Sequence, residues 1–141
     1  VLLYSVIRNR KVLTKVDYSL LATFVALFVF IGNVGRIPFF SHALMRIIGG
    51  RETITAIIAS QVISNVPAAI LLAGFTDNIS ALIVGTNIGG LGTLIASMAS
   101  LISFKYISRD KPDLKKKYFI IFTISNIVFL IILVVLYYLS L

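Results

Sequence analysis

The sequence predicts an all-α integral membrane protein on three observations. Hydrophobic residues make up 59% of the 141 residues, above the share of about 45–50% in soluble domains. The Lys and Arg residues gather in segments that flank apolar runs, as in cytoplasmic membrane loops. Two apolar stretches are interrupted by polar or glycine-rich patches, at residues 64–67 and 87–93. We therefore expect membrane helices, some of them broken. We attribute the net charge of +8 to membrane topology and expect no nucleic-acid partner.

The first residues read as the end of a membrane span. Residues 1–7 are apolar and precede a basic segment that contains Arg8, Arg10 and Lys11, the reverse of the order in a signal peptide. We expect the chain to be the C-terminal part of a longer protein, with a processed chain as the alternative.

Three further elements follow from hydropathy and charge. Residues 19–35 are uncharged over 17 positions, near the minimum for a membrane helix. Residues 38–51 mix apolar and basic side chains and contain a glycine pair, which predicts a helix lying at the membrane surface. Residues 118–141 are uncharged and aliphatic, so they predict a membrane helix that follows a basic loop at 105–117.

Residues 53–76 admit two topologies. As a crossing span, their better orientation leaves nine Lys and Arg inside and four outside; as a re-entrant hairpin open to the outside, ten lie inside and three outside. A crossing span would place five polar or helix-breaking residues near the bilayer centre: Ser60, Gln61, Ser64, Asn65 and Pro67. Each half has about a dozen residues, the length of a hairpin arm. We predict a hairpin with its tip at 64–67, loops 1–18 and 105–117 in the cytoplasm, and the C-terminus outside.

The hairpin tip carries groups that suit ions. Pro67 lacks an N–H and fits the first turn of a second arm. Ser64 and Asn65 are favoured N-cap residues for that arm. The helix N-terminus there favours an anion, whereas carbonyls freed at the end of the first arm suit Na⁺ or a proton carrier. The alternative is an ordinary span kinked at proline.

The span predicted at residues 79–104 is broken at 87–93. Its glycines allow close approach of the backbone to a ligand, and Thr86, Asn87 and Thr93 supply polar groups. The alternative is packing, because Gly85 and Gly89 have the four-residue spacing typical of membrane helix contacts.

Ten residues of the two breaks form the candidate substrate- or ion-binding set: Ser64, Asn65, Val66, Pro67, Thr86, Asn87, Gly89, Gly90, Gly92 and Thr93. Carbonyls near Ser64 and Asn87 are the expected Na⁺ ligands. No catalytic residue, resident metal or cofactor is expected, because the chain has no Cys, one His and five acidic residues. We therefore do not expect an enzyme.

Two motifs carry a family resemblance: Ser64-Asn65-Val66-Pro67-Ala68-Ala69 and Gly85-Thr86-Asn87-Ile88-Gly89-Gly90-Leu91-Gly92-Thr93. In this order they resemble the C-terminal repeat of the ion transporter superfamily, over residues 18–141. That group includes citrate-transporter-like permeases, arsenite efflux permeases, certain Na⁺/H⁺ antiporters and divalent-anion:Na⁺ symporters.

The resemblance implies two inverted repeats, each with a re-entrant hairpin and a broken helix, and a site between them near the membrane midplane. Ser64 and Asn65 would be the tip that touches substrate and cation. The facing loop would contain Asn87, Gly89, Gly90 and Thr93. The dicarboxylate branch has Ser-Asn-Thr at the tip where this chain continues with Val66, which places the chain nearer the citrate, arsenite and antiporter branches.

The expected function is secondary active transport of an inorganic or organic anion, by symport with Na⁺ or H⁺ and alternating access. Cation/H⁺ antiport or arsenite efflux is the alternative within transport, and a structural multi-pass membrane subunit is the alternative of another class. The expected partners are the small anion, the lipid bilayer, an N-terminal repeat of the same transporter and a second copy in a homodimer. The expected location is a prokaryotic plasma membrane, the cell inner membrane.

Overall fold

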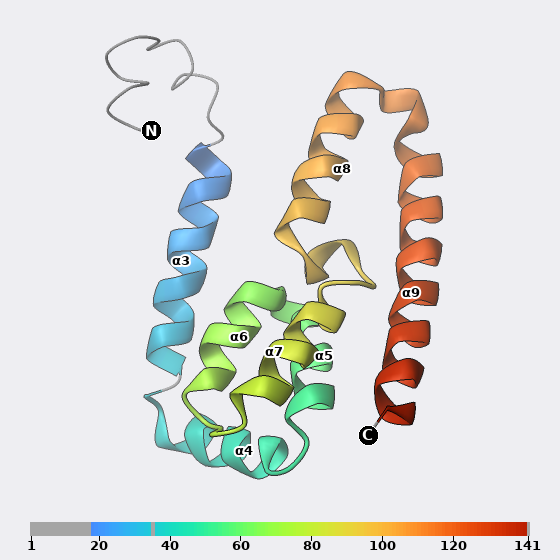
Figure 1. Cartoon of the computed structure of the whole chain (residues 1–141). Coiled ribbons are helices and arrows are strands. Elements are labelled where there is room, and N and C mark those ends of the chain that lie inside the picture. The colour runs from blue at the N-terminus through green and yellow to red at the C-terminus, as the bar shows by residue number, and fades with distance from the viewer. Residues whose placement is uncertain (1–17, 35, 141) are drawn as a thin grey trace, which may run out of the picture. The chain divides into compact units, whose positions relative to one another are not determined.

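The computed structural model describes residues 18–34 and 36–140, and every regular element in this part of the chain is helical. Of the loop predicted at 1–18, residues 1–17 lie outside the described residues, and Tyr18 begins a helix. The elements are α3 (Tyr18–Val34), α4 (Pro38–Ile48), α5 (Glu52–Ile63), α6 (Asn65–Ala73), α7 (Ile79–Gly89), the 3₁₀ turn η1 (Leu94–Ala96), α8 (Met98–Asp110), the 3₁₀ turn η2 (Pro112–Leu114) and α9 (Lys115–Leu139) (Figure 1).

The chain divides into two compact units, Val1–Phe30 and Ile31–Leu141. Of the first, the structure describes the larger part of α3. Several of its apolar side chains are more than half exposed, among them Leu21, Val25 and Phe30. This exposure is expected of a helix that faces lipid.

One described helical stretch is long and apolar enough to cross a membrane. It runs over Pro112–Leu139, which is η2 with α9. The number of such spans rises to two if Leu21–Val34 and Pro38–Ile48 together form one broken span. The apolar helices α5 and α7 have 12 and 11 residues, about 18 and 17 Å at 1.5 Å per residue, too short to cross a hydrocarbon core of about 30 Å.

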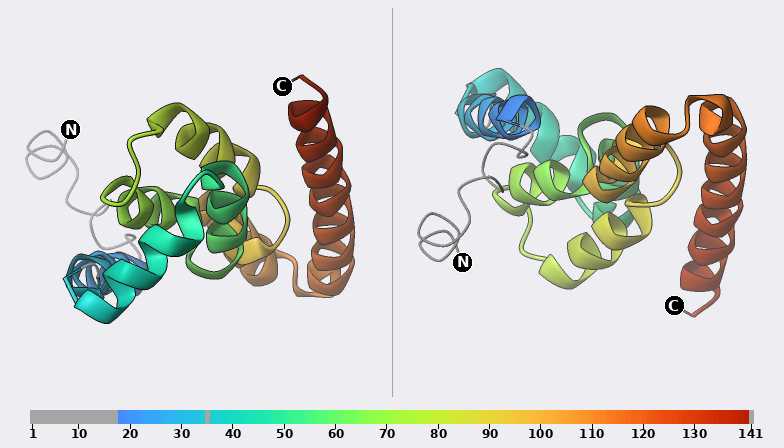
Figure 2. Two further views of the ribbon diagram at one scale, coloured as in Figure 1. Left: turned by 90° about the horizontal axis from the view of Figure 1, so that it is seen from below. Right: turned by 90° about the horizontal axis from the view of Figure 1, so that it is seen from above.

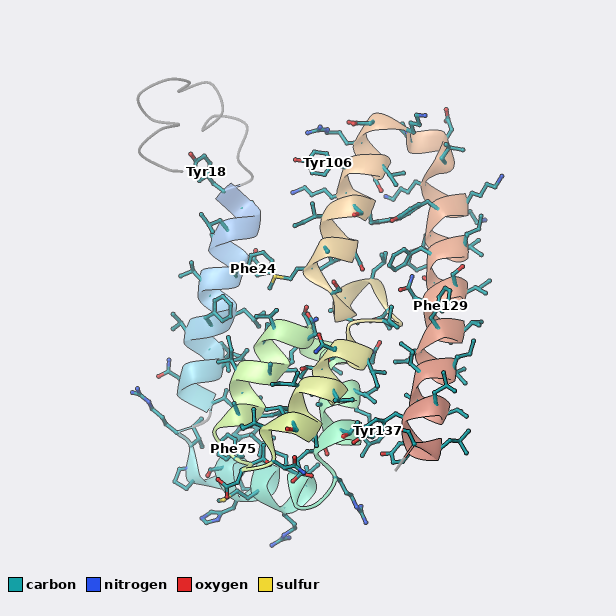
Figure 3. The ribbon with its side chains drawn as sticks, viewed as in Figure 1. Tyr18, Phe24, Phe75, Tyr106, Phe129 and Tyr137 are labelled. Atoms are coloured by element: carbon teal, nitrogen blue, oxygen red, sulfur yellow. The ribbon has the colours of Figure 1, made fainter. Side chains whose placement is uncertain are left out.

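The second unit has a small core where α4, α5, α6 and α7 meet. Ile48, Ala56, Leu72 and Leu82 are each at most 3% exposed and pack together, with Phe75 partly buried against them (Figure 3). Each helix contributes one of these four side chains. Figure 2 shows α5, α6 and α7 gathered into one cluster from above and below.

The chain reverses direction at Ser64, so α5 and α6 form a hairpin. Beyond α6, the Thr76 hydroxyl donates to Glu52 Oε1 at 3.2 Å, at the first residue of α5. The start of one arm is thereby tied to the end of the other.

The helices α5 and α7 run parallel. At their starts the Thr53 hydroxyl donates to the Ala81 carbonyl at 3.2 Å, and at their ends Gln61 Nε2 donates to the Gly89 carbonyl at 2.8 Å. Gly85 has no side chain where it meets α5: a Cβ there would lie 2.5 Å from the Thr53 carbonyl oxygen. This contact supports the packing interpretation of that glycine.

The helix α9 returns alongside α8 and α7. At its start Tyr118 stacks on Phe104 of α8 with ring centroids 6.2 Å apart. Near its end the Tyr137 hydroxyl lies 3.1 Å from Thr53 Oγ1, and Figure 3 shows Tyr137 directed from α9 toward the α5–α7 cluster. No residue of α9 is buried, which leaves its aliphatic side chains accessible to lipid.

The structure differs from the sequence interpretation at two boundaries. The stretch predicted as a basic loop at 105–117 is mostly helical, because α8 continues to Asp110 and α9 begins at Lys115. The break predicted at 87–93 begins later, since α7 remains helical through Gly89 and regular α-helix resumes only at Met98.

Candidate functional site

The first break is centred on a single strained residue. Ser64 has φ 73° and ψ 153°, a backbone region occupied almost only by glycine and worth about 1–3 kcal/mol of strain. Ser64 is 4% exposed, and its hydroxyl donates to the Ala96 carbonyl at 3.4 Å, at the far side of the second break. Strain at a residue that contacts the other break is a feature typical of functional sites.

The predicted N-caps differ from the structure. Ser64 occupies the N-cap position of α6, but its side chain makes no capping hydrogen bond, because the hydroxyl points to Ala96. Asn65 Oδ1 instead accepts from the Val66 N–H at 2.9 Å. Pro67 is buried in the first turn of α6, where its missing N–H costs no helix hydrogen bond, while the Val66 side chain is exposed.

The second break runs from Gly90 to Ser97. Two candidate residues lie before it in regular helix and bond to their own turn. The Thr86 hydroxyl donates to the Leu82 carbonyl at 3.0 Å, and Asn87 Nδ2 donates to the Ile83 carbonyl at 2.9 Å. Of the two, Thr86 is buried and Asn87 is exposed.

Gln61, which lies outside the candidate set, joins the two breaks. Its Nε2 donates to the carbonyls of Gly89 at 2.8 Å and Leu91 at 2.9 Å, and its Oε1 accepts from the Thr93 N–H at 3.0 Å. One side chain at the end of α5 therefore satisfies three backbone groups that the unwinding of α7 leaves without a helix partner. The signal in the sequence is a glutamine three residues before the tip, flanked by Val62 and Ile63 on the side toward the tip.

Gly92 and Thr93 complete this contact. Gly92 has φ +102°, a conformation that favours glycine, and a Cβ there would lie 2.5 Å from Gln61 Oε1, so a side chain would displace the end of Gln61. The Thr93 hydroxyl donates to the Gln61 carbonyl at 3.3 Å and accepts from the Ala96 N–H at 3.2 Å. The second break is held against the end of α5 by both side chain and backbone.

Asn65 lies against the second break from the other arm. A Cβ at Gly90 would lie 2.9 Å from Asn65 Nδ2, so the amide contacts the backbone where α7 ends. Gly89 is buried and packs on α5, where a Cβ would lie 2.8 Å from Ser60 Oγ. The structure thus brings together Ser64, Asn65, Gly90, Gly92 and Thr93, with Gln61 between them.

The electrostatics of this region come from dipoles. The parallel helices α5 and α7 both end here and present partial negative charge, while α6 begins here and presents partial positive charge. Asp77 is exposed in the turn between α6 and α7, and no group of three or more His, Cys, Asp or Glu within residues 18–34 and 36–140 is placed to hold a metal ion. Hydroxyl, amide and backbone groups of this kind can bind a small ion or polar solute.

We expect glycine to be tolerated at position 64 better than alanine. Ser64→Gly and Ser64→Ala both lose the hydroxyl bond to Ala96, but only glycine relieves the backbone strain of about 1–3 kcal/mol. The glycine variant should therefore unfold at a higher temperature than the alanine variant, measured by circular dichroism in detergent. Equal midpoints, or a more stable alanine variant, would contradict a strained backbone at this position.

Together, the helical fold, the apolar α9 and the broken helices define a helical protein with the features of a membrane protein.

No protein-family model and no solved structure matches the chain. Two curated proteins do. The chain is 44% identical over 91 residues to a protein of Methanocaldococcus jannaschii named uncharacterized transporter MJ0456, a match over 64% of this chain and 26% of the relative. It is 36% identical over 99 residues to the inner membrane protein YbiR of Escherichia coli K12, over 68% of this chain and 27% of the relative. The matches thus span about a quarter of the length of these relatives. These names and the apolar α9 together support a membrane location.

Proposed function

We propose that the chain forms part of a secondary active membrane transporter and that its two helix breaks build half of the substrate site. The observation that carries the proposal is the Gln61 bridge, which joins the end of α5 to the unwound segment after α7. Non-helical backbone at membrane depth is tolerated where it lines a site or is buried in protein, and half-helix ends recur at transporter sites.

The contacts of α9 indicate the depth of the breaks. Thr53 contacts both Ala81 at the start of α7 and Tyr137 near the end of α9, so these two residues lie at a similar height along α9. At the other end of α9, Tyr118 stacks on Phe104 of α8. At 1.5 Å per residue, about 14 Å of helix separates Ala81 from Gly90, and about 10 Å separates Ser97 from Phe104. If α9 spans the bilayer, both breaks lie near its middle, and the α5–α6 pair enters and leaves on the Tyr137 side as a re-entrant hairpin.

The polarity of the helix ends supports an anion coupled to a cation. The start of α6 at Asn65 carries partial positive charge and suits an anion. The ends of α5 and α7 carry partial negative charge and suit Na⁺ or a proton carrier. In the complete transporter, a first inverted repeat would supply the facing half of the site and a second copy would complete a homodimer. Cation/H⁺ antiport and arsenite efflux remain the alternatives within transport.

A structural membrane subunit is the second candidate, and one observation favours it. Gly85 and Gly89 contact α5 too closely for any side chain, so part of the glycine motif serves helix packing. Packing leaves unexplained the strain at Ser64 and the amide of Asn65 against Gly90.

The two candidates differ in what they predict for Asn65→Ala. An amide that binds an ion contributes about 1.5–3 kcal/mol, so uptake should fall roughly 10- to 100-fold while the amount of folded protein stays unchanged. The measurement is flux of a panel of anions into proteoliposomes, with and without a Na⁺ gradient, using the intact polypeptide that carries this chain.

Asn126→Ala is the matched control, because the Asn126 amide donates only to the Phe122 carbonyl of its own helix at 2.8 Å. It should leave flux unchanged. A parallel loss of flux and folded protein in Asn65→Ala would favour the structural subunit instead.

A further inference from the structure

A groove separates α8 from α9 at their connected ends, away from the helix breaks. It has a volume of about 570 Å³ and is lined by side chains of α8, η2 and α9 and of the residue between α8 and η2: Tyr106, Ile107, Asp110, Lys111, Leu114, Lys117, Tyr118 and Ile121. Figure 3 shows Tyr106 near the end of α8 that leads into η2. The stacking of Phe104 on Tyr118 fixes the two helices together below the groove.

The groove combines two kinds of surface. Ile107, Leu114 and Ile121 give it an apolar surface, and the exposed residues Lys111 and Lys117 line it as well. Asp110 also lines it, but its carboxylate accepts a charge-assisted hydrogen bond from Arg109 Nε at 3.0 Å. Within residues 18–34 and 36–140, neither lysine forms an ion pair. With two lysines and one aspartate, the lining carries a net positive charge beside aliphatic side chains.

The position of the groove matches the membrane surface. The uncharged stretch of α9 begins at Tyr118, directly after Lys117, and Tyr106 and Tyr118 are the aromatic type enriched at that depth. A phospholipid at this level has its phosphate beside the lysines and the start of its acyl chains beside the apolar surface. Basic pockets between membrane helices on the cytoplasmic side are known to hold anionic headgroups.

We propose that the α8–α9 groove is a binding site for an anionic phospholipid. Lys111 and Lys117 bind the phosphate and headgroup, and Ile107, Leu114 and Ile121 contact the acyl chain. A free phosphate would use the lysines alone and leave the apolar surface without a function, so the combination favours the lipid. The site is independent of transport and depends only on membrane insertion of α9.

The test is native mass spectrometry of the intact protein with equimolar phosphatidylglycerol and phosphatidylcholine. Phosphatidylglycerol should occupy the wild-type protein several-fold more than phosphatidylcholine. Removing one lysine, by Lys117→Gln or Lys111→Gln, should lower that preference roughly five-fold. Lys117 lies in α9 and Lys111 lies between α8 and η2. Because the two variants change different segments, the test remains valid if one of them fails to fold.

Lys116→Gln is the matched control, because Lys116 precedes Lys117, carries the same charge and does not line the groove. It should keep the preference for phosphatidylglycerol. Equal occupancy by both lipids would overturn the proposal, as would an equal effect of Lys116→Gln, which indicates diffuse surface charge. Displacement of the lipid by millimolar inorganic phosphate would assign the lysines to a free anion and overturn it as well.

Discussion

Gly85→Ala should destabilise the protein by about 2–3 kcal/mol, since overpacking typically costs about 1–3 kcal/mol and here the obstruction is backbone. The added Cβ would lie 2.5 Å from the Thr53 carbonyl oxygen and 2.8 Å from the Thr53 Cα atom. Neither atom can rotate away, so α7 must move off α5. That movement also strains the Gln61 bonds at the far end of the same contact.

Thermal unfolding in detergent, followed by helical circular dichroism, measures this effect. Gly74→Ala is the matched control: it adds the same methyl group at the end of α6, where φ is −77° and the nearest atom would lie 3.9 Å away. A surface substitution of this kind usually changes the free energy of unfolding by about 0.5 kcal/mol or less. The unfolding midpoint of the control should therefore lie within about a degree or two of the wild-type midpoint. An unchanged midpoint in Gly85→Ala would show that α5 and α7 are not in contact at this glycine.

Gln61→Met should release the second break from α5 while leaving the volume of the side chain nearly unchanged. The substitution removes the bonds to the Gly89 and Leu91 carbonyls and from the Thr93 N–H. At about 1 kcal/mol net for each bond, the segment should open roughly 100-fold more often. Hydrogen exchange of a peptide covering residues 90–97, read by mass spectrometry, measures this opening.

Asn126→Leu tests whether any lost amide would give the same result. Its single bond runs to Phe122 within α9, so exchange at residues 90–97 should stay at the wild-type rate. Unchanged exchange in Gln61→Met would mean that the second break is held by other contacts. If the proposed transport function holds, Gln61→Met should also reduce flux through the intact polypeptide that carries this chain, because a mobile break no longer presents fixed carbonyls.

The sequence located the breaks better than it located their boundaries. Pro67 and the glycines after Thr86 mark where helix is disfavoured, because proline lacks an N–H and glycine loses entropy in a helix. Tertiary contacts can nevertheless stabilise a helix beyond such residues. The helix α7 extends to Gly89 because Gly85 and Gly89 pack on α5. The basic segment at 105–117 was likewise predicted as a loop from its charge. Lys and Arg are good helix formers, however, and α8 continues into the segment as far as Asp110 while α9 begins within it at Lys115.

The contact partners of the polar side chains could not be predicted from the sequence. Asn87 resembles Asn65 in type and in its place at a predicted helix break, yet Asn87 bonds its own helix and Asn65 lies against Gly90. Which of these occurs depends on the direction of each side chain around its helix and on which helix packs there. The same reason hides Gln61, whose three bonds reach residues 28 to 32 positions away along the chain.

Residue order alone suffices to predict that the chain is helical and apolar and that regular helix is interrupted at two places, because these properties are local. Composition, periodicity and the chemistry of proline and glycine act within a few residues. The three-dimensional packing was needed to see that α5 and α7 run parallel and end side by side, so that the two breaks meet through Gln61. Contacts between distant segments follow from how whole helices pack, and no local pattern encodes that arrangement.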